Sequence, residues 1–302
     1  MKKKLLVFIF LLENTFSSFA HVYVTVPPSE KIQTDSVSTR SSFCRYVPER
    51  KGDFSWENDK IGFRVYSKEV QKKPNAIVSG FDCWLKRVPY LVLDKWYAMN
   101  QQGKTYHRDY GEGCDCYGVG ESRGCGGSAL FIDGQYVTSP YYERYEIIEN
   151  GPNKCVFKLY YAPIVVGNDS VVEIKTITME KGNFYFKCED EFISKRKFSV
   201  LAVGIAQHGG KGVVNSSQNG WISYWEPMQD SKMGSAVWCT KKDFLDKNVE
   251  LDSTDKNANL WLHIKLRKNK VTYYAGFTWL KAGYHSSNEL WLNYVKEISE
   301  TL

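Results

Sequence analysis

The sequence predicts an all-β protein, a large antiparallel β-sandwich with a short C-terminal helix. Alternating apolar and polar residues recur in one short segment after another through the second half of the chain. Pairs of turn residues such as Asp-Gly and Asn-Gly separate these segments, and no helical pattern lies between them. Strands in series without intervening helices indicate a sandwich rather than a parallel sheet flanked by helices.

The first 20 residues predict a signal peptide. Lys2 to Lys4 form a basic start, Leu5 to Leu12 form an apolar run, and Ser18 to Ala20 offer the small residues of a cleavage site. The apolar run is too short to span a bilayer, and no cysteine follows the cleavage site, so we expect no membrane anchor. We therefore expect an exported protein, periplasmic or extracellular, whose mature part at 21–302 is a single β-sandwich domain.

The first elements of the mature chain are predicted from short alternating segments. Residues 22–26 read VYVTV and predict a strand. Residues 61–66 predict another strand, with Phe63 and Arg64 on opposite faces. Residues 91–97 fit either a strand or one helical turn, because their periodicity does not decide between them.

The chain is organised around a glycine-rich segment, Tyr106 to Gly127, which reads YHRDYGEGCDCYGVGESRGCGG. Seven of its 22 residues are glycine, and each glycine inside a helix costs about 1 kcal/mol relative to alanine. The segment also lacks the alternation of a strand, so we expect an irregular loop. A loop of this length with charged, aromatic and cysteine side chains is more typical of a functional site than of a plain connection.

After this segment the predicted elements follow one another closely. We expect hairpin turns at Asp133-Gly134 and Lys268-Asn269. We also expect a short helix at Thr240 to Asn248 and a final helix that begins at a capping box, Ser286 to Glu289, and packs on the sandwich. The predicted strands are 128–132, 136–137, 141–149, 155–162, 171–179, 184–192, 199–206, 220–226, 260–266 and 271–280.

Net charge and aromatic content narrow the class of ligand. The predicted leader carries three lysines and one glutamate, so its removal lowers the formal net charge from +6 to +4. This charge is too small to predict nucleic-acid binding, but it suits a local basic pocket for an anionic ligand. Aromatic residues make up 15% of the chain, which suits both a β-rich core and a carbohydrate pocket. We expect an acidic oligosaccharide as the partner, no nucleic acid, and a monomer or weak oligomer.

Histidine, tyrosine and arginine side chains in and near the glycine-rich segment predict proton abstraction, since no serine or cysteine nucleophile is evident. Arg123 would pair with the carboxylate of a sugar acid and stabilise the negative charge that develops beside it. Tyr117 or His107 would take the proton from the neighbouring carbon, and His208 would assist the leaving group. These four residues are the predicted catalytic set.

Other polar and aromatic residues are predicted to bind the substrate. Two further functions stay open, which are hydrolysis by the carboxylates of Glu112 and Asp115, and sugar binding without reaction. Plainer roles compete with these, such as a histidine bonded to a backbone carbonyl or a carboxylate paired with Arg108 or Arg123. The predicted substrate-binding residues are Arg64, Lys95, Arg108, Asp109, Glu112, Asp115, Trp221 and Trp225.

Eight cysteines raise the question of disulfides and metal binding in an exported chain. Cys114 and Cys116 stand too close in the sequence to pair comfortably with each other, whereas either could reach Cys83 or Cys125. Their spacing lacks the second close pair that a zinc site needs, so we assign no metal ligand. No cofactor is predicted, and a role for a divalent cation is left open.

Several longer motifs resemble a bacterial family of exported proteins designated as a domain of unknown function, DUF4861. The resemblance covers most of the mature chain and implies a galactose-mutarotase-like β-supersandwich. It also implies an association with pectin- and ulvan-degrading enzymes and similarity to an ulvan oligosaccharide dehydratase, which removes water from a terminal uronic acid. The motifs are WENDKIGFRVYS at 56–67, DKWY at 94–97, the glycine-rich segment, ENGP at 149–152 and KLYYAP at 158–163.

The resemblance assigns the family pattern to particular positions of the glycine-rich segment. Cys114 and Cys116 depart from that pattern, which weakens any metal site built on them. Together with the residue chemistry, the resemblance predicts a secreted carbohydrate-active enzyme that acts on uronic-acid-containing oligosaccharides by β-elimination, as a dehydratase or a lyase. The matching positions are His107, Asp109, Gly111, Glu112, Gly113, Asp115, Tyr117, Arg123 and Gly124.

Overall fold

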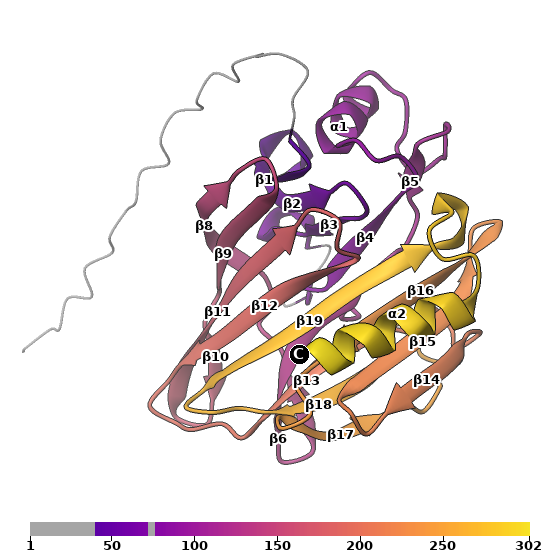
Figure 1. Ribbon diagram of the computed structural model, residues 1–302. Helices are drawn as coiled ribbons and strands as arrows, with labels where there is room; N and C mark the ends of the chain where they lie inside the picture. Colours follow the sequence, from indigo (N-terminus) through magenta and orange to yellow (C-terminus); the bar gives the residue numbers. More distant parts are fainter. Residues whose placement is uncertain (1–39, 72–75) are drawn as a thin grey trace, which may run out of the picture. The chain divides into compact units, whose positions relative to one another are not determined.

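The computed structural model describes residues 40–71 and 76–302 (Figure 1). The predicted signal peptide and the predicted strand at 22–26 lie outside the described residues. No helix in the described part of the chain is both long enough and apolar enough to cross a membrane.

The described residues form three antiparallel sheets, which confirms the predicted all-β class. The first sheet contains, in spatial order, β1 (Ser42–Val47), β2 (Asp53–Asn58), β3 (Gly62–Val65), β4 (Phe81–Lys86) and β5 (Gly113–Asp115). The second contains β14 (Val213–Ser217), β15 (Trp221–Met228), β16 (Ser231–Trp238), β19 (Lys270–Trp279), β12 (Tyr185–Ile193), β11 (Asp169–Glu180), β9 (Lys154–Tyr161) and β8 (Tyr142–Asn150), with β10 (Ile164–Val166) paired to β11. The third contains β17 (Phe244–Asn248), β18 (Asn259–Lys265), β13 (Val200–Ala206), β6 (Cys125–Ile132) and β7 (Gln135–Val137). Three short 3₁₀ helices join elements, namely η1 (Pro48–Arg50), η2 (Lys68–Val70) and η3 (Leu280–Ala282).

Two of the predicted hairpin turns are confirmed by their backbone angles. Between β6 and β7, Asp133 and Gly134 have φ angles of 48° and 80°. Between β18 and β19, Lys268 and Asn269 have φ angles of 54° and 61°. Positive φ at both central residues is the signature of a type I′ turn, whose twist matches that of the flanking strands.

The first and third sheets pack against one face of the nine-stranded sheet, which makes the structure a sandwich. The ring of Phe186 on β12 lies 5.8 Å from that of Trp56 on β2 and 4.9 Å from that of Phe63 on β3. On the same face, the hydroxyl of Tyr273 on β19 donates a 2.8 Å hydrogen bond to the carbonyl of Gly126 on β6. Burial of each large aromatic side chain in this core contributes about 1.5–3 kcal/mol to stability.

Helix α1 (Leu93–Gln101) resolves the ambiguity of the segment at 91–97. The buried carboxylate of Glu57 caps its N-terminus and accepts a 2.8 Å hydrogen bond from the backbone N–H of Leu93. Lys86 Nζ lies 2.9 Å from the same carboxylate, and both side chains are fully buried. A carboxylate is favourable at this place because the first N–H groups of a helix lack intrahelical partners.

The predicted C-terminal helix is confirmed as α2 (Asn288–Thr301). The predicted capping box from Ser286 to Glu289 is wrong by one residue, because the cap is Ser287, whose Oγ accepts a hydrogen bond from Leu290 N at 3.2 Å. The helix lies along β15 and β16 (Figure 1). Its buried Trp291 donates a 3.0 Å hydrogen bond to Ser223 Oγ on β15. The helix therefore covers the face of the nine-stranded sheet that is opposite to the sandwich core.

The predicted helix at Thr240 to Asn248 is wrong. The N–H groups of Asp243 and Phe244 both bond to the carbonyl of Thr240, at 3.0 and 3.1 Å, which makes a single turn. From Phe244 onwards the chain is β17 and pairs with β18. An isolated helix of this length is marginal in water, so strand pairing decides the conformation.

Candidate active site

The glycine-rich segment is fixed against β4, because β5 at its centre pairs antiparallel with that strand. Gly113 has a φ angle of +119°, and a Cβ atom there would lie 2.0 Å from the carbonyl oxygen of Leu85. Gly124 has a φ angle of +60°, and a Cβ atom there would lie 1.9 Å from the carbonyl oxygen of Phe81. Only glycine permits both approaches, so these two residues set the position of the side chains between them.

His208 lies just beyond the end of β13, where it adopts a positive φ of 46°. Its Nδ1 atom is 2.9 Å from each carboxylate oxygen of Glu226, and its Nε2 atom is 3.0 Å from the carbonyl oxygen of Gly118. A carbonyl can only accept, so Nε2 carries a proton; with Glu226 ionised, Nδ1 carries one as well and the ring is an imidazolium. Burial alone would lower the pKa of His208, but the hydrogen bond and charge of Glu226 outweigh burial and raise it.

Tyr117 packs edge-on against His208, with 4.4 Å between the ring centres. Its hydroxyl is buried and has no hydrogen-bond partner among the described residues. Burial, followed by the nearby thiol of Cys83, raises the pKa of Tyr117 well above its usual range. A tyrosine that holds its proton this firmly is a poor base, so its contribution here is to pack against the imidazolium of His208.

His107 contacts the same short stretch of chain. Its Nδ1 atom is 2.7 Å from the carbonyl oxygen of Asp115, and its side chain is 62% exposed. Because a carbonyl only accepts, Nδ1 donates this hydrogen bond and carries a proton. In the tautomer that is protonated only at Nδ1, the lone pair of Nε2 can accept a proton from outside the protein.

The two histidines are therefore anchored to one four-residue stretch, Asp115 to Gly118. His107 donates to its first carbonyl and His208 to its last. Three residues of extended chain span at most about 11 Å, so the two anchoring carbonyls are close together. The arrangement places the two imidazole rings at the two ends of one segment.

Arg64 is an internal anchor for this stretch, with only 2% of its surface exposed. Its Nη2 atom lies 2.8 Å from Asp115 Oδ2, 2.5 Å from Asp82 Oδ2 and 3.0 Å from the hydroxyl of Tyr66. Burial, followed by the charge of Asp115, raises the pKa of Asp82 to about 7. Arg64 is thus occupied by protein carboxylates and presents almost no surface to a substrate.

Arg123 is also buried, with 2% of its surface exposed. It donates hydrogen bonds to Ser79 Oγ at 2.9 Å and to the carbonyl of Glu121 at 3.3 Å. A Cβ atom at position 204 would lie 2.6 Å from Arg123 Cβ, so Gly204 provides the space for this side chain. Burial lowers the pKa of Arg123 to about 10. This interior position suits support of the loop rather than contact with a substrate carboxylate.

Glu112, which directly precedes β5, forms an ion pair with Lys95 of α1. Lys95 Nζ lies 2.5 Å from Glu112 Oε1, the Tyr90 hydroxyl bonds to the same oxygen, and Trp96 Nε1 donates to Oε2 at 3.3 Å. Burial alone would raise the pKa of Glu112, but these partners, Lys95 first, lower it. A carboxylate with a lowered pKa is a weak proton donor, which does not favour the hydrolytic role considered for Glu112.

Asp109 shapes the loop, whereas Arg108 is exposed. Asp109 Oδ1 accepts hydrogen bonds from the N–H groups of Gly111 and Gly113 at 2.7 and 3.0 Å, and Oδ2 lies 3.1 Å from Arg87 Nε. The guanidinium carbon of Arg108 lies 5.6 Å from the ring centre of Tyr110. Of the cations predicted to bind substrate, Arg108 and Lys95 are the two that are exposed.

Trp221 and Trp225 lie on β15 with only 5% and 7% of their surfaces exposed. Ser223 stands between them on the same face of the strand and bonds to Trp291 of α2. Glu226 has the opposite parity on β15, so it faces the interior of the sandwich. The structure therefore separates the two tryptophans from the Glu226–His208 pair.

Glu226 and Asp82 are two members of the site that the sequence analysis did not identify. Each is the one acidic residue of a mostly apolar strand, in WISYWEPM and FDCWLK. A buried charge is costly unless it is paired with an opposite charge. An acidic residue at a strand position that faces the core is therefore the sequence feature that could have identified both residues. The sequence could not say which cation would pair with each one.

The cysteines are arranged differently from the expectation based on spacing. Cys114 and Cys116 lie side by side, with their Sγ atoms 2.9 Å apart. Cys83 instead shares a hydrogen bond with Cys125. Within residues 40–71 and 76–302, no three histidine, cysteine, aspartate or glutamate side chains come together as metal ligands.

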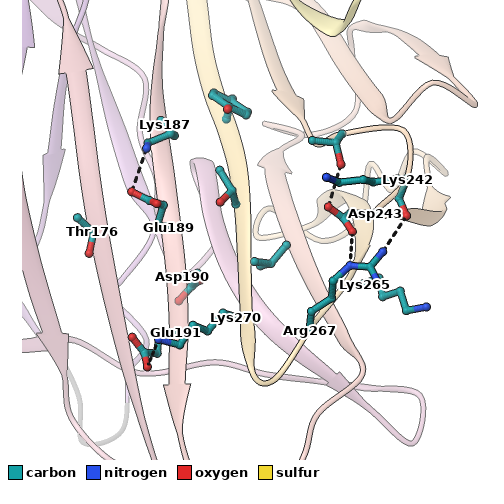
Figure 2. Close-up of a pocket in the computed structure, with 14 residues that line it drawn as sticks. Thr176, Lys187, Glu189, Asp190, Glu191, Lys242, Asp243, Lys265, Arg267 and Lys270 are labelled. Carbon is teal, nitrogen blue, oxygen red and sulfur yellow. Dashed lines mark hydrogen bonds and ion pairs between the residues drawn. The ribbon is translucent and has the colours of Figure 1, made fainter. Parts of the chain in front are cut away.

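A pocket of about 690 Å³ lies elsewhere, over β11, β12 and β19 (Figure 2). It contains none of the predicted site residues. Tyr274 in its lining shares the α2 face of the nine-stranded sheet, because it pairs with Trp238, which pairs with Trp221. Three carboxylates of the pocket are neutralised by ion pairs, Lys187–Glu189 at 3.0 Å, Lys270–Glu191 at 2.7 Å and Arg267–Asp243 at 2.9 Å. We therefore assign the candidate site to the histidines and not to this pocket.

Comparison with known sequences gives one family and one relative. Residues 14–302 match the family model described as a domain of unknown function, DUF4861. Uncharacterized protein P7 of Formosa agariphila is 36% identical over 274 residues, which cover 88% of this chain and 69% of the relative.

Two solved structures share part of the chain path. A protein from the human microbiome assigned as a kojibiose phosphorylase matches 86% of this chain with a TM-score of 0.46 and 11% identity. A quadruple mutant of the α-N-acetylgalactosaminidase NagBb from Bifidobacterium bifidum matches 85% with a TM-score of 0.40 and 10% identity. The chain spans only 37% and 38% of the lengths of these two proteins. Neither likeness contributes to the functional proposal below.

Proposed function

The chain belongs to the DUF4861 family, and from the site just described we propose that it is an exported enzyme that acts on uronic-acid-containing oligosaccharides by β-elimination. The reaction would be that of a dehydratase or a lyase. A proton leaves the carbon beside the carboxylate, its electron pair forms a carbon–carbon double bond, and the carbon–oxygen bond at the next carbon breaks. The leaving group departs as water in a dehydratase and as a sugar hydroxyl in a lyase.

The observation that supports this proposal most is the anchoring of two histidines to one stretch of chain, each through a different ring nitrogen. Elimination needs a base for the carbon acid and an acid for the departing oxygen. His107 offers a lone pair on Nε2 because its Nδ1 proton is given to the carbonyl of Asp115. His208 is held as an imidazolium by Glu226, so it can give its Nε2 proton to a leaving oxygen that takes the place of the Gly118 carbonyl.

The developing negative charge on the substrate needs a nearby cation. Arg64 and Arg123 are buried and already bonded within the protein, so neither enters this proposal as a substrate ligand. Arg108 is exposed and adjacent in sequence to His107, which supports it as the residue that pairs with the substrate carboxylate. The imidazolium of His208 adds a second positive charge to the same site.

Hydrolysis by Glu112 and Asp115 is the less favoured function. Lys95 pairs with Glu112, and the buried Arg64 pairs with Asp115. Hydrolysis requires one carboxyl group that stays protonated as the acid, and a neighbouring cation favours the ionised form instead.

The test is to incubate the purified protein with saturated and 4,5-unsaturated uronate oligosaccharides prepared from pectin and ulvan. Ultraviolet absorbance follows the double bond conjugated to the carboxylate, and mass spectrometry identifies the products. A rising band with loss of one water from an intact chain supports a dehydratase, and a rising band with chain cleavage supports a lyase. New reducing ends without the band would replace elimination by hydrolysis, and bound but unchanged sugar would leave a carbohydrate-binding protein.

A further inference from the structure

Cys114 and Cys116 form the one cysteine pair of the described chain that has both close sulfur atoms and access to solvent. Their Sγ atoms are 2.9 Å apart. Cys114 is buried, whereas Cys116 is partly exposed. The cysteine pairs Cys44–Cys155 and Cys83–Cys125 also share hydrogen bonds, but all four residues are buried and closed to a reagent in the folded protein.

The two sulfur atoms need little movement to form a covalent bond. Cys114 lies in the short strand β5, and Cys116 is the first residue after it. Contraction from 2.9 Å to a bond of about 2.05 Å requires a movement of less than 1 Å. The folded chain therefore already holds the two sulfurs almost in position.

We propose that Cys114 and Cys116 are a disulfide site, which is oxidised in the exported protein by exchange with a small-molecule disulfide such as glutathione disulfide. The two thiols lose two protons and two electrons and form one sulfur–sulfur bond. The glutathione disulfide accepts them, its own sulfur–sulfur bond breaks, and two glutathione thiols are released. Partly exposed Cys116 is the sulfur that attacks first, and buried Cys114 resolves the mixed disulfide.

The bond encloses the residue that anchors His107. Asp115 lies between the two cysteines, and its carbonyl accepts the Nδ1 proton of His107 at 2.7 Å. Its carboxylate is bonded to Arg64 at 2.8 Å, and Tyr117, the residue after Cys116, packs on His208. A disulfide across Asp115 removes backbone freedom from the stretch that carries both histidine anchors. The positioning role rests on the proposed function and deepens it, because the disulfide would hold in place the residue that orients His107, the proposed base.

The bond itself is tested without reference to any sugar. The full chain is exported by an expression host, unfolded without reductant, alkylated, and digested for mass spectrometry. We expect the peptide that contains both cysteines to be two hydrogen atoms lighter than its thiol form and to escape alkylation until a phosphine reductant is added. Recovery of both residues as alkylated thiols, also after incubation with glutathione disulfide, would overturn the proposal.

A matched set of variants separates this bond from other oxidation. The double variant Cys114→Ser, Cys116→Ser should lose two reductant-dependent thiols, whereas Cys239→Ser, at a buried cysteine, should lose none. The reaction of Cys116 should accelerate at higher pH, because its contact with Cys114 and its burial raise its pKa and keep the thiolate scarce.

The positioning role has its own readout, which is turnover of the sugar in the oxidised and reduced protein. We expect kcat to fall by about tenfold on reduction and in the double serine variant, and to stay unchanged in Cys239→Ser. Equal kcat in the oxidised and reduced protein would overturn the positioning role. If no sugar is turned over in any form, the proposed function fails, and the mass of the peptide still decides whether the bond exists.

Discussion

The Nδ1 atom of His208 lies 2.9 Å from both carboxylate oxygens of Glu226. The two residues come from different sheets, because His208 follows β13 and Glu226 belongs to β15. Burial raises the pKa of Glu226, and the hydrogen bond from His208 opposes that rise. The carboxylate of Glu226 therefore favours the charged form of the His208 imidazole. The proposed acid step uses this charged form, because His208 gives a proton to the leaving oxygen.

Replacement of Glu226 with glutamine should remove that charge. In Glu226→Gln, burial acts on His208 without an opposing carboxylate, so the pKa of His208 should fall below its usual value. Loss of the proton donor should lower kcat by about 100-fold or more. The histidine ring signals in NMR spectra recorded over a pH series report the pKa. The control is Glu189→Gln on the opposite face of the sheet, and an unchanged His208 titration in Glu226→Gln would contradict the assignment.

Replacement of His107 with glutamine should affect turnover far more than stability. The side chain is 62% exposed and makes one hydrogen bond, to the Asp115 carbonyl, so the melting temperature should change little. If His107 is the base, kcat should fall by about 10²–10⁴-fold. His263→Gln is the matched control, since His263 is bonded to Tyr136 on the third sheet and enters no proposed step. A fully active His107→Gln protein would remove His107 from the mechanism.

Strands could be predicted from the sequence where one face is buried and the other is exposed to solvent, because apolar and polar residues then alternate along the strand. β9 and β11 follow this rule and were predicted almost to their ends. β16 was missed because it reads SKMGSAVW, without alternation of large apolar residues. Its Gly234 lies under Trp291 of α2, and a Cβ atom there would lie 2.5 Å from the tryptophan ring. The helix thus supplies the bulk that the strand lacks, and such a partner is not visible locally.

The candidate site could be predicted only in part, for a related reason. The glycine-rich segment and His208 were found because unusual backbone requirements leave a mark in the sequence, as glycines and as a histidine before a glycine pair. The burial of Arg64 and Arg123 left no such mark, since an arginine at an exposed position of a strand or a loop has the same sequence pattern. Their partners Asp115 and Ser79 lie 51 and 44 residues away. These tertiary contacts decide whether the two arginine side chains are buried or exposed.

Replacement of Arg64 with methionine should destabilise the protein strongly. The guanidinium compensates the buried carboxylates of Asp82 and Asp115, which would be left without a cation. Loss of one partner of a buried ion pair costs about 3–5 kcal/mol. Urea unfolding measures the change, and Arg267→Met is the control because that arginine is 56% exposed and its pair with Asp243 should contribute less than about 1 kcal/mol. Equal losses of stability in the two variants would contradict the buried anchor.

The stability of the protein should fall as the pH rises from 5 to 8. Burial raises the pKa of Asp53 to about 6 and, with neighbouring charges, the pKa values of Asp82 and Asp190 to about 7, above the ordinary value of 3.8. Between pH 4 and 7 the folded state therefore holds more protons than the unfolded chain, so the free energy of unfolding decreases with pH in this window. The raised pKa of His208 acts in the same direction, because its contribution is complete below the unfolded value of about 6.5 and is lost as the pH rises through the folded value.

Carboxyl groups with lowered pKa values, such as Glu112, do not affect stability between pH 5 and 8. Their contribution to the free energy of unfolding is lost only below about pH 4.5. The expected result is a melting temperature several degrees higher at pH 5 than at pH 8, because each 1 kcal/mol corresponds to about 2–4 °C for a chain of this size.

Asp53→Asn provides the matched variant, since an asparagine side chain is neutral at every pH. One carboxylate oxygen of Asp53 has no hydrogen-bond partner among the described residues. The variant should flatten the pH dependence between pH 4 and 6 and leave the part above pH 6 in place. A melting temperature that is constant or rises from pH 5 to 8 in the unchanged protein would show that these carboxyl groups are ionised at neutral pH, with Arg64 and Lys175 compensating them fully.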